Sequence, residues 1–337
     1  MIRQAIEKLV TGTDLSAEES RQTLEEIMTG QTDAALVEEF LTALSSKGET
    51  EAEILGAAQT LREHSIKIPH RQEKLFDCCG TGGDGAQTFN ISTTMALVVA
   101  GTGVAVGKHG NRSVSSKSGS ADFLEAAGVK LELSPEKVGK CIDEIGIGFI
   151  YAPVFHPAMK TLAAVRKKMR IRTIFNILGP LCNPAGPTHQ LIGVWEENLT
   201  EKIARVCSKL GTNKCWVVHG GSGIDELITF ASNQVSACSN GTIETFRLDP
   251  QEFNFLPADN LSLKSENVDA SLNTVYRVLA GEKCAARDTV ILNSAAALVV
   301  AEKTARLEEG IELAQESIDS GKARLKLKQL EEFSQKC

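Results

Sequence analysis

A β-prone run and the start of a helix are joined in this chain by the stretch Asp77-Cys-Cys-Gly80-Thr-Gly-Gly83-Asp84-Gly-Ala-Gln-Thr88-Phe-Asn90-Ile-Ser92-Thr93. Four glycines fall within the six residues 80–85. Glycine permits positive φ angles and lets bare backbone N–H groups approach a ligand closely. A helix that begins near residues 90–93 adds unpaired N–H donors and a partial positive charge. The stretch therefore predicts a strand–loop–helix unit that binds an anion such as phosphate, although an ordinary tight turn with Ser/Thr capping would share part of this pattern.

Short β-prone runs alternate with helical patterns on both sides of this stretch. The runs lie at 75–79, 104–106, 147–151 and 215–218. This alternation favours a mostly parallel sheet covered by helices on both faces. Asn240-Gly241 separates runs at 235–239 and 242–248, which predicts an antiparallel hairpin. The tail at 294–330 is rich in Ala, Leu, Glu and Lys, and we expect it to be helical.

The first seventy residues carry only helical patterns. Four apolar stripes with a period of three to four residues follow one another, and the first three end near Gly12, Gly30 and Gly48. Capping-box patterns, Ser16-x-x-Glu19 and Thr50-x-x-Glu53, precede the second and fourth stripes. We expect a small all-helical domain at residues 1–72.

Composition excludes several classes of protein. The 337 residues carry a net charge of −7 and only 5% aromatic residues, which opposes binding to nucleic acid. No continuous apolar stretch reaches the ~18–20 residues of a membrane span, and the N-terminus has the pattern of an amphipathic helix and not of a signal peptide. The nine cysteines include no C-x-x-C pair, so we expect reduced thiols and a cytoplasmic protein.

A basic segment runs from Lys108 to Asp122, in the order Lys-His-Gly-Asn-Arg-Ser-Val-Ser-Ser-Lys-Ser-Gly-Ser-Ala-Asp. Three cations, four hydroxyls and two glycines fall within residues 108–119. Such a segment, placed after a strand, is suited to wrapping a pyrophosphate with charge-assisted hydrogen bonds. The alternative is a solvated charged face.

Two further segments carry chemistry. Prolines flank an aromatic patch that contains Phe155 and His156, and basic residues including Arg166 follow it, which suits an aromatic carboxylate. A strand near 215–218 ends in a glycine turn that delivers Asp225 and Glu226. Two adjacent carboxylates at a strand end suit Mg²⁺, which takes a few protein oxygens and completes its shell with water and phosphate. The alternatives are a structural histidine and acids at the start of a helix.

These segments, in this order, resemble the anthranilate phosphoribosyltransferase family over essentially the whole chain. The family's G-T-G-G-D…T-F-N-I-S-T block matches residues 80–93, and its K-H-G-N-R…S-S…S-G-S-A-D block matches 108–122. Its R-T-x-F-N-x-L-G-P-L-x-N-P block matches 172–184, and its V-H-G…D-E block matches 218–226. Many members have D-G before the carboxylate pair where this chain has Ser222-Gly223, which puts only the hydrogen bonding around that pair in doubt.

The resemblance implies a transferase that joins anthranilate to phosphoribosyl pyrophosphate with Mg²⁺, in tryptophan biosynthesis. It implies an α/β fold: a small N-terminal all-helical domain at 1–72, with a contribution from about 165–190, and a large α/β domain at 73–337 with a central mostly parallel sheet flanked by helices. The implied partners are the two substrates and a second copy of the chain, joined through the helical domain. Neither nucleic acid nor membrane is expected.

The resemblance also implies roles for individual residues. Anthranilate would meet Gly80, Asn111 and Arg166, with His109 and His156 along its approach. Ser92, Asp225 and Glu226 would be the Mg²⁺ positions. The phosphoribosyl donor would be held by Gly80, Gly83, Asp84, Thr88, Asn90, Ile91, Ser92, Thr93, Lys108, His109, Gly110, Asn111, Arg112, Ser113, Val114, Ser115, Ser116 and Ser120.

Two other readings remain open from the residues alone. A pyrimidine nucleoside phosphorylase would have a similar fold and use free phosphate. The long basic segment and the carboxylate pair fit a pyrophosphate donor with a metal better. A non-catalytic homologue that binds nucleic acid would show a basic groove and damaged loops, and neither is apparent.

Overall fold

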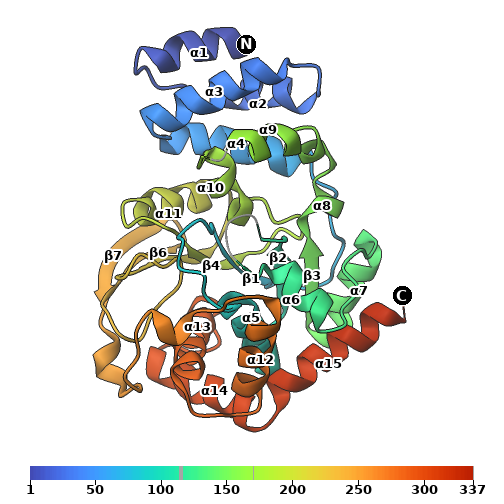
Figure 1. Cartoon of the computed structure of the whole chain (residues 1–337), viewed down its shortest axis with the longest axis vertical. Helices are drawn as coiled ribbons and strands as arrows, with labels where there is room; N and C mark the ends of the chain where they lie inside the picture. Colours follow the sequence, from blue (N-terminus) through green and yellow to red (C-terminus); the bar gives the residue numbers. More distant parts are fainter. Residues whose placement is uncertain (114–116, 170, 337) are drawn as a thin grey trace.

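The computed structural model describes residues 1–113, 117–169 and 171–336. Figure 1 shows a layer of helices at one end of the molecule, above a larger part built on a sheet. The helical layer contains α1 (Ile2–Val10), α2 (Ala17–Met28), α3 (Ala34–Lys47) and α4 (Glu51–Glu63). Among the described residues, no helix is long and apolar enough to cross a membrane.

The larger part holds a seven-stranded sheet in the order β3-β2-β1-β4-β5-β6-β7. Its first five members in that order are parallel, and β6 is antiparallel to both of its neighbours, β5 and β7. The predicted mostly parallel sheet and the hairpin at Asn240-Gly241 are therefore confirmed. The strands are β1 (Phe76–Gly80), β2 (Val106–Gly110), β3 (Ile147–Tyr151), β4 (His189–Gly193), β5 (Lys214–Gly220), β6 (Asn233–Ser239) and β7 (Thr242–Leu248).

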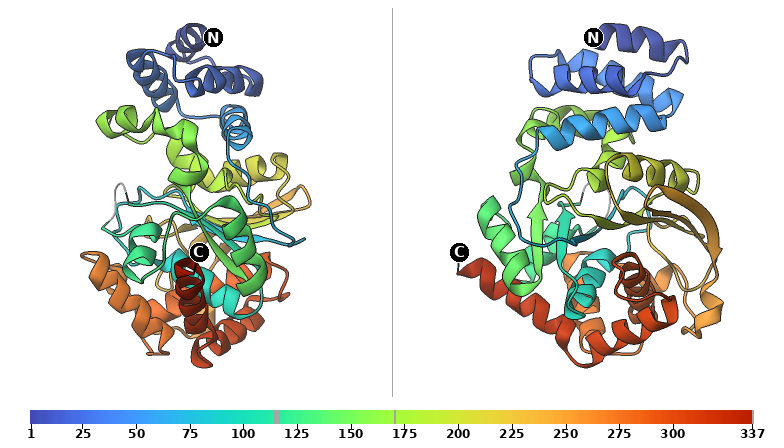
Figure 2. Two further views of the ribbon diagram at one scale, coloured as in Figure 1. Left: turned by 90° about the vertical axis from the view of Figure 1, so that its right-hand side faces the viewer. Right: turned by 180° about the vertical axis from the view of Figure 1, so that it is seen from behind.

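Helices cover both faces of this sheet, as Figure 2 shows from two further sides. Strand β5 illustrates how: Trp216 and Val218 belong to one buried apolar cluster, whereas Cys215 and Val217 belong to another. This alternation follows from the two-residue period of a strand. The helices are α5 (Ile91–Gly101), α6 (Ser120–Ala126), α7 (Pro135–Ile145), α8 (Ala152–Phe155), α9 (Ala163–Met169), α10 (Ile174–Leu181), α11 (Leu199–Lys209), α12 (Val268–Leu279), α13 (Ala285–Val300), α14 (Leu307–Asp319) and α15 (Lys322–Gln335).

Two features of the sheet differ from the sequence-based expectation. The second strand was expected at 104–106 but spans Val106–Gly110, so Lys108 and His109 lie in the strand and not in a loop. Both side chains are buried, because a strand inside a parallel sheet is covered on both faces. Strand β4 was not foreseen. It starts with His189 and Gln190. Gln190 is buried, and its side-chain amide donates to the carbonyl of Pro180 at 2.9 Å.

The apolar core of the helical layer continues into residues far along the chain. Leu162, Val165, Ile174 and Leu181 share one buried cluster with the inward faces of α1 to α4. Figure 1 shows α9 at the level of α4 and α10 beneath them. The sheet-facing helix α11 adds residues to the same cluster, so the helical layer rests on one face of the sheet through a continuous apolar contact.

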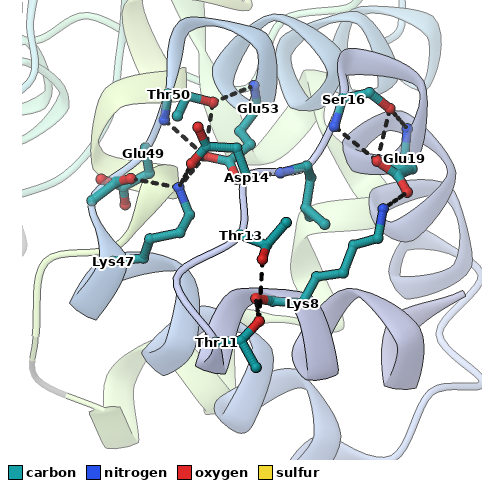
Figure 3. Close-up of polar contacts among 12 residues, drawn as sticks. Lys8, Thr11, Thr13, Asp14, Ser16, Glu19, Lys47, Glu49, Thr50 and Glu53 are labelled. Carbon is teal, nitrogen blue, oxygen red and sulfur yellow. Dashed lines mark hydrogen bonds and ion pairs between the residues drawn. The ribbon is translucent and has the colours of Figure 1, made fainter.

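Both predicted capping boxes are present (Figure 3), and their glutamates differ in burial. Glu53 is fully buried: its carboxylate accepts hydrogen bonds from the backbone N–H groups of Leu15 at 2.9 Å and Thr50 at 2.7 Å, and pairs with Lys47 at 3.0 Å. Glu19 caps α2 in the same way, but its side chain remains 31% exposed. One buried carboxylate therefore joins α3, α4 and the segment that enters α2.

Replacing Glu53 with Gln should lower the free energy of unfolding by about 3 kcal/mol or more, because it removes one partner of a buried, hydrogen-bonded ion pair. Glu19→Gln, at the same position of the exposed box, should cost less than about 1 kcal/mol, because Gln is also accepted in a capping box. Urea denaturation followed by circular dichroism measures both values. Equal losses in the two variants would contradict the role given to Glu53.

Candidate active site

The loops that follow several parallel strands meet at one edge of the sheet. The glycine-rich loop leaves β1, the basic segment leaves β2, and Asp225 follows the turn after β5. The carboxyl ends of parallel strands lie at the same edge, and ligands of such sheets bind where neighbouring connections diverge. Strand β1 lies at this divergence, since β2 and β3 extend the sheet on one side of it and β4 and β5 on the other.

The glycine-rich loop adopts a conformation that few other residues could take. Gly82, Gly83 and Gly85 have φ angles of +65°, +75° and +75°. Such angles are strained for residues with a Cβ atom. The N–H of Gly82 donates to Asp225 Oδ2 at 2.7 Å, and the N–H of Asp225 lies 3.4 Å from Asp84 Oδ2. The loop is thus held against the segment that carries the acidic pair.

Two glycines allow this close approach. A Cβ atom on Gly80 would lie 2.2 Å from Asp225 Oδ2, and one on Gly193 would lie 1.5 Å from the carbonyl oxygen of Asp225. Neither distance is possible between non-bonded atoms. The ends of β1 and β4 must therefore carry glycine for Asp225 to sit between them.

Asp225 and Glu226 are half-buried and lie close to other acids. Burial and the nearby Asp84 carboxylate raise the pKa of Asp225 to about 7. Burial and the Asp225 carboxylate raise the pKa of Glu226 well above its usual range, opposed in part by the Lys108 charge and by the backbone N–H of Ser92 at the start of α5. The predicted strand end with paired carboxylates is confirmed. The alternative of acids in the first turn of a helix is wrong, because the next α-helix described after Glu226 is α12, which starts at Val268.

This donor set fits a hard divalent cation. Burial and mutual repulsion disfavour the ionised carboxylates, and a cation between their oxygens would favour the ionised forms; carboxylate oxygens are also ligands that Mg²⁺ prefers. In the described part of the chain, no group of three or more His, Cys, Asp or Glu side chains could by itself hold a metal ion. Mg²⁺ is commonly bound by one or two carboxylates, with water and substrate phosphate completing its shell.

The start of α5 lacks a side-chain cap, because Asn90 is occupied elsewhere. Asn90 Oδ1 accepts hydrogen bonds from Ser271 at 2.6 Å and Ser118 at 2.8 Å, and all three residues are buried. The N-terminal end of α5 is therefore not satisfied by its own N-cap residue, which suits an anion there. Sequence reasoning missed Ser271, which lies 181 positions from Asn90 and carries no motif of its own. Next to Asn90, Ile91 and Thr93 are buried, and Thr88 forms an isolated bridge with Lys264.

The basic segment is divided between a strand and a loop. Lys108 is buried and donates to the carbonyl of His109 at 3.1 Å. The guanidinium of Arg112 pairs with Asp122 at 3.1 Å and Glu125 at 2.7 Å, so its charge is already paired with two acidic side chains.

Asp122 organises the rest of this loop. Its Oδ2 accepts the backbone N–H groups of Ser113 at 3.0 Å and Gly119 at 2.9 Å. Ser120 Oγ donates to the carbonyl of Asn111 at 3.3 Å, and Gly110 ends strand β2 beside it. The predicted positions Val114, Ser115 and Ser116 lie outside the described residues.

Two buried histidines lie close together at the other side of β2. The rings of His109 and His156 have centroids 5.3 Å apart, and His109 Nδ1 lies 3.1 Å from the carbonyl of Gly179 on α10. Burial and the neighbouring His156 lower the pKa of His109 to about 3, and burial and Lys67 lower the pKa of His156 to about 4. Both rings are therefore neutral near pH 7. Each Nε2 is buried without a hydrogen-bond partner among the residues described.

Arg166 reaches the same helix from α9. Its guanidinium lies 5.4 Å from the centre of the Phe175 ring on α10, and burial lowers its pKa. Within the described ranges, no acidic side chain pairs with Arg166, and no hydrogen bond joins it to the histidine pair. Arg166 and His109 thus both contact α10, at Phe175 and Gly179.

The chain matches two family models that together span most of its length. Residues 72–324 match the glycosyl transferase family, a/b domain, and residues 3–65 match the helical bundle domain of the same family. The anthranilate phosphoribosyltransferase of Symbiobacterium thermophilum is 47% identical over 333 residues, which cover 99% of this chain and 98% of that protein.

Solved structures agree with these matches. The anthranilate phosphoribosyltransferase of Thermus thermophilus superposes with a TM-score of 0.92 at 40% identity, covering 98% of this chain and 99% of that one. The enzyme of Saccharomyces cerevisiae, solved in complex with PRPP and Mg, gives a TM-score of 0.91 at 26% identity, covering 100% of this chain and 98% of that one. The yeast enzyme has also been solved in complex with 4-fluoroanthranilate. The fold, the glycine-rich edge of the sheet and these matches agree: the chain belongs to the glycosyl transferase family and, within it, to the anthranilate phosphoribosyltransferases.

Proposed function

We propose that this chain transfers the phosphoribosyl group of phosphoribosyl pyrophosphate to the amine of anthranilate, giving N-(5-phosphoribosyl)anthranilate and pyrophosphate in tryptophan biosynthesis. One observation supports this most strongly: a glycine-rich anion loop and the Asp225–Glu226 pair converge on one edge of the sheet. That combination suits a substrate with a pyrophosphate group and a metal ion. The yeast relative in complex with PRPP and Mg supports the same assignment.

The carboxylates Asp225 and Glu226, with Ser92, would hold Mg²⁺. Bound Mg²⁺ would offset the negative charge that gathers on the pyrophosphate as it leaves. The raised pKa values of both carboxylates support this role, because burial and the neighbouring acids disfavour the ionised carboxylates, and a divalent cation would compensate for both effects. The yeast enzyme has also been solved with Mg bound.

The donor would lie along the glycine-rich loop and the start of α5. Backbone N–H groups there can donate to phosphate oxygens, and the helix end favours negative charge. Lys108 would turn from the His109 carbonyl toward a phosphate, and its burial would strengthen such a contact. Asn90 would act indirectly, since its amide already joins Ser118 and Ser271 and thereby fixes where α5 begins.

Arg112 stands apart from these donor contacts. Glu125 accepts two hydrogen bonds from its guanidinium, at 2.7 and 2.9 Å. A phosphate contact to Arg112 would have to replace this bidentate pair. The remaining members of the proposed donor set are Gly80, Gly83, Asp84, Thr88, Ile91, Thr93, His109, Gly110, Asn111, Ser113, Val114, Ser115, Ser116 and Ser120.

Anthranilate would bind between β2 and the helices α9 and α10, against His109, His156 and Arg166, with Gly80 and Asn111 at the donor side. Neutral imidazoles present apolar faces to an aromatic ring, and their unpartnered Nε2 atoms can accept a hydrogen bond from an amine. Partial burial of Arg166 strengthens a charge-assisted bond to a carboxylate.

The proposed reaction requires little acid–base catalysis. The amine nitrogen forms a bond to C1 of the ribose while the bond from C1 to the pyrophosphate oxygen breaks, through a transition state with oxocarbenium character. The amine of anthranilate is neutral near pH 7, so no strong base is required before attack. Holding the two substrates in line across the site would supply much of the rate.

We further propose the domain division at residues 72 and 73, with about 165–190 contributing to the helical domain. The helical-bundle model ends at residue 65 and the α/β model begins at residue 72, which supports a boundary close to this position, and the shared apolar cluster supports the contribution. A homodimer through the helical domain is supported by exposed apolar side chains on it, Met1 and Val10. A cytoplasmic location is supported by the free thiols of the described cysteines.

Loss of anthranilate fluorescence tests the proposed reaction. We expect a decay that requires the protein, both substrates and Mg²⁺, and that EDTA abolishes. A folded protein that binds the donor but leaves the fluorescence unchanged would point to a different acceptor and contradict the assignment.

Arg166→Ala should raise the KM for anthranilate about 10- to 100-fold, because a hydrogen bond to a charged group contributes ~1.5–3 kcal/mol. The KM for the donor should stay within about twofold of the wild-type value. Lys168→Ala on the same helix, whose lysine pairs with Glu38, is the matched control and should change neither constant. Equal increases in both KM values for Arg166→Ala would rule out a specific role with anthranilate.

A further inference from the structure

Arg172 touches the glycine-rich loop, although it lies between α9 and α10. Its guanidinium donates a hydrogen bond to the carbonyl of Gly83, in the middle of the loop. The same group lies 5.1 Å from the centre of the Trp195 ring, and 3.7 Å from Glu196 Oε1, in the segment that follows β4. The side chain is 47% exposed, so its contacts are with these surface segments and not with the core.

The backbone of Arg172 is also held by a contact with the helical layer. Ser45 on α3 donates its hydroxyl to the carbonyl of Arg172 at 2.9 Å. The next residue, Thr173, is buried as the N-cap of α10, which fixes where the chain runs. One residue therefore joins the helical layer, the end of β4 and the loop beside the acidic pair.

The glycine-rich loop requires contacts that hold it in one conformation. Its three glycines with positive φ can reach many other conformations, so the loop loses much conformational entropy when it is fixed. Asp225 holds it at Gly82, and Arg172 holds it at the next residue. Asp84, which lies against Asp225, follows directly. The two contacts together hold the peptide groups on either side of the Gly82–Gly83 peptide unit.

Arginine suits this position better than lysine. A planar guanidinium can stack on an indole ring and donate in its own plane at the same time. A lysine ammonium can reach a carbonyl but presents no flat face to Trp195. A Cβ atom on Gly83 would lie 3.5 Å from Arg172 Nε, so the guanidinium lies directly beside the loop.

We propose that Arg172 is a positioning residue that holds the glycine-rich loop in the conformation that binds the phosphoribosyl donor. It acts through the Gly83 carbonyl, with Trp195 and Ser45 fixing its own place. The statement about the donor rests on the proposed function, whereas the hold on the loop does not.

Three measurements on Arg172→Ala test this proposal. Amide hydrogen exchange of the ligand-free protein should become faster in residues 81–88 and stay unchanged in the strands. Calorimetric titration with phosphoribosyl pyrophosphate and Mg²⁺ should show about tenfold weaker binding. In turnover, the KM for the donor should rise, while kcat at saturating donor stays within about twofold. Lys168→Ala, an exposed cation nearby, is the control and should match the wild type in every readout.

Two further readouts separate positioning from a general loss of structure. Arg172→Lys should restore part of the donor affinity, and millimolar guanidinium ion should restore part of it in Arg172→Ala. Unchanged exchange in residues 81–88 would overturn the hold on the loop. Faster exchange with unchanged donor affinity would overturn its role in donor binding. A wild-type protein that binds no donor would contradict the proposed function itself, and the exchange result would still decide whether Arg172 holds the loop.

Discussion

The site depends on how closely Asp225 approaches the backbones of two neighbouring strands. Its carbonyl and its carboxylate press against Gly193 and Gly80, where even a methyl group could not fit. This contact places the carboxylate within hydrogen-bonding distance of the Gly82 N–H, and so determines where the glycine-rich loop begins its turn. The strand order provides the geometry, since β1 and β4 are adjacent parallel strands that end at the same edge.

The close approach has an electrostatic consequence. Asp84, Asp225 and Glu226 carry like charges in a partly desolvated place, which costs folding free energy and raises the pKa values of the latter two. Ionisable groups whose placement lowers the stability of the fold are frequently functional. An acidic cluster beside an anion loop makes chemical sense if a divalent cation lies between the carboxylates and the phosphates. The contact of Arg172 with Gly83 would then hold the glycine-rich loop, which would bind the phosphates.

Local signals predicted the parts of the fold that local physics determines. The four N-terminal helices and both capping boxes follow from apolar spacing and from Ser or Thr three residues before Glu. The hairpin follows from Asn240-Gly241. Burial was not predictable in the same way: Lys108 and His109 looked like loop residues because charged and polar side chains rarely continue a central strand. The identity of Glu53 as a buried link also depends on tertiary packing that no capping pattern reveals.

The candidate site divides similarly. The sequence brought out the residues in dense motifs, such as the glycines of the loop and the carboxylate pair. Ser271, which anchors Asn90, and Trp195, which stacks on Arg172, come from distant segments without a motif, so only the folded chain shows them. The ion pair between Arg112 and Glu125 could not be predicted either, because the sequence does not show which acidic side chain lies next to a cation of the basic segment.

Binding of Mn²⁺, followed by electron paramagnetic resonance with phosphoribosyl pyrophosphate present, tests the central claim most directly. The claim is that Asp225 and Glu226 are held at this edge in order to bind a divalent cation together with the donor. We predict that the wild type binds Mn²⁺, that Mg²⁺ displaces it, and that Asp225→Asn combined with Glu226→Gln weakens binding at least about tenfold. Glu282→Gln, which alters an exposed ion pair with Arg277, should bind Mn²⁺ as the wild type does. Equal Mn²⁺ affinity in the wild type and the double variant would contradict the account.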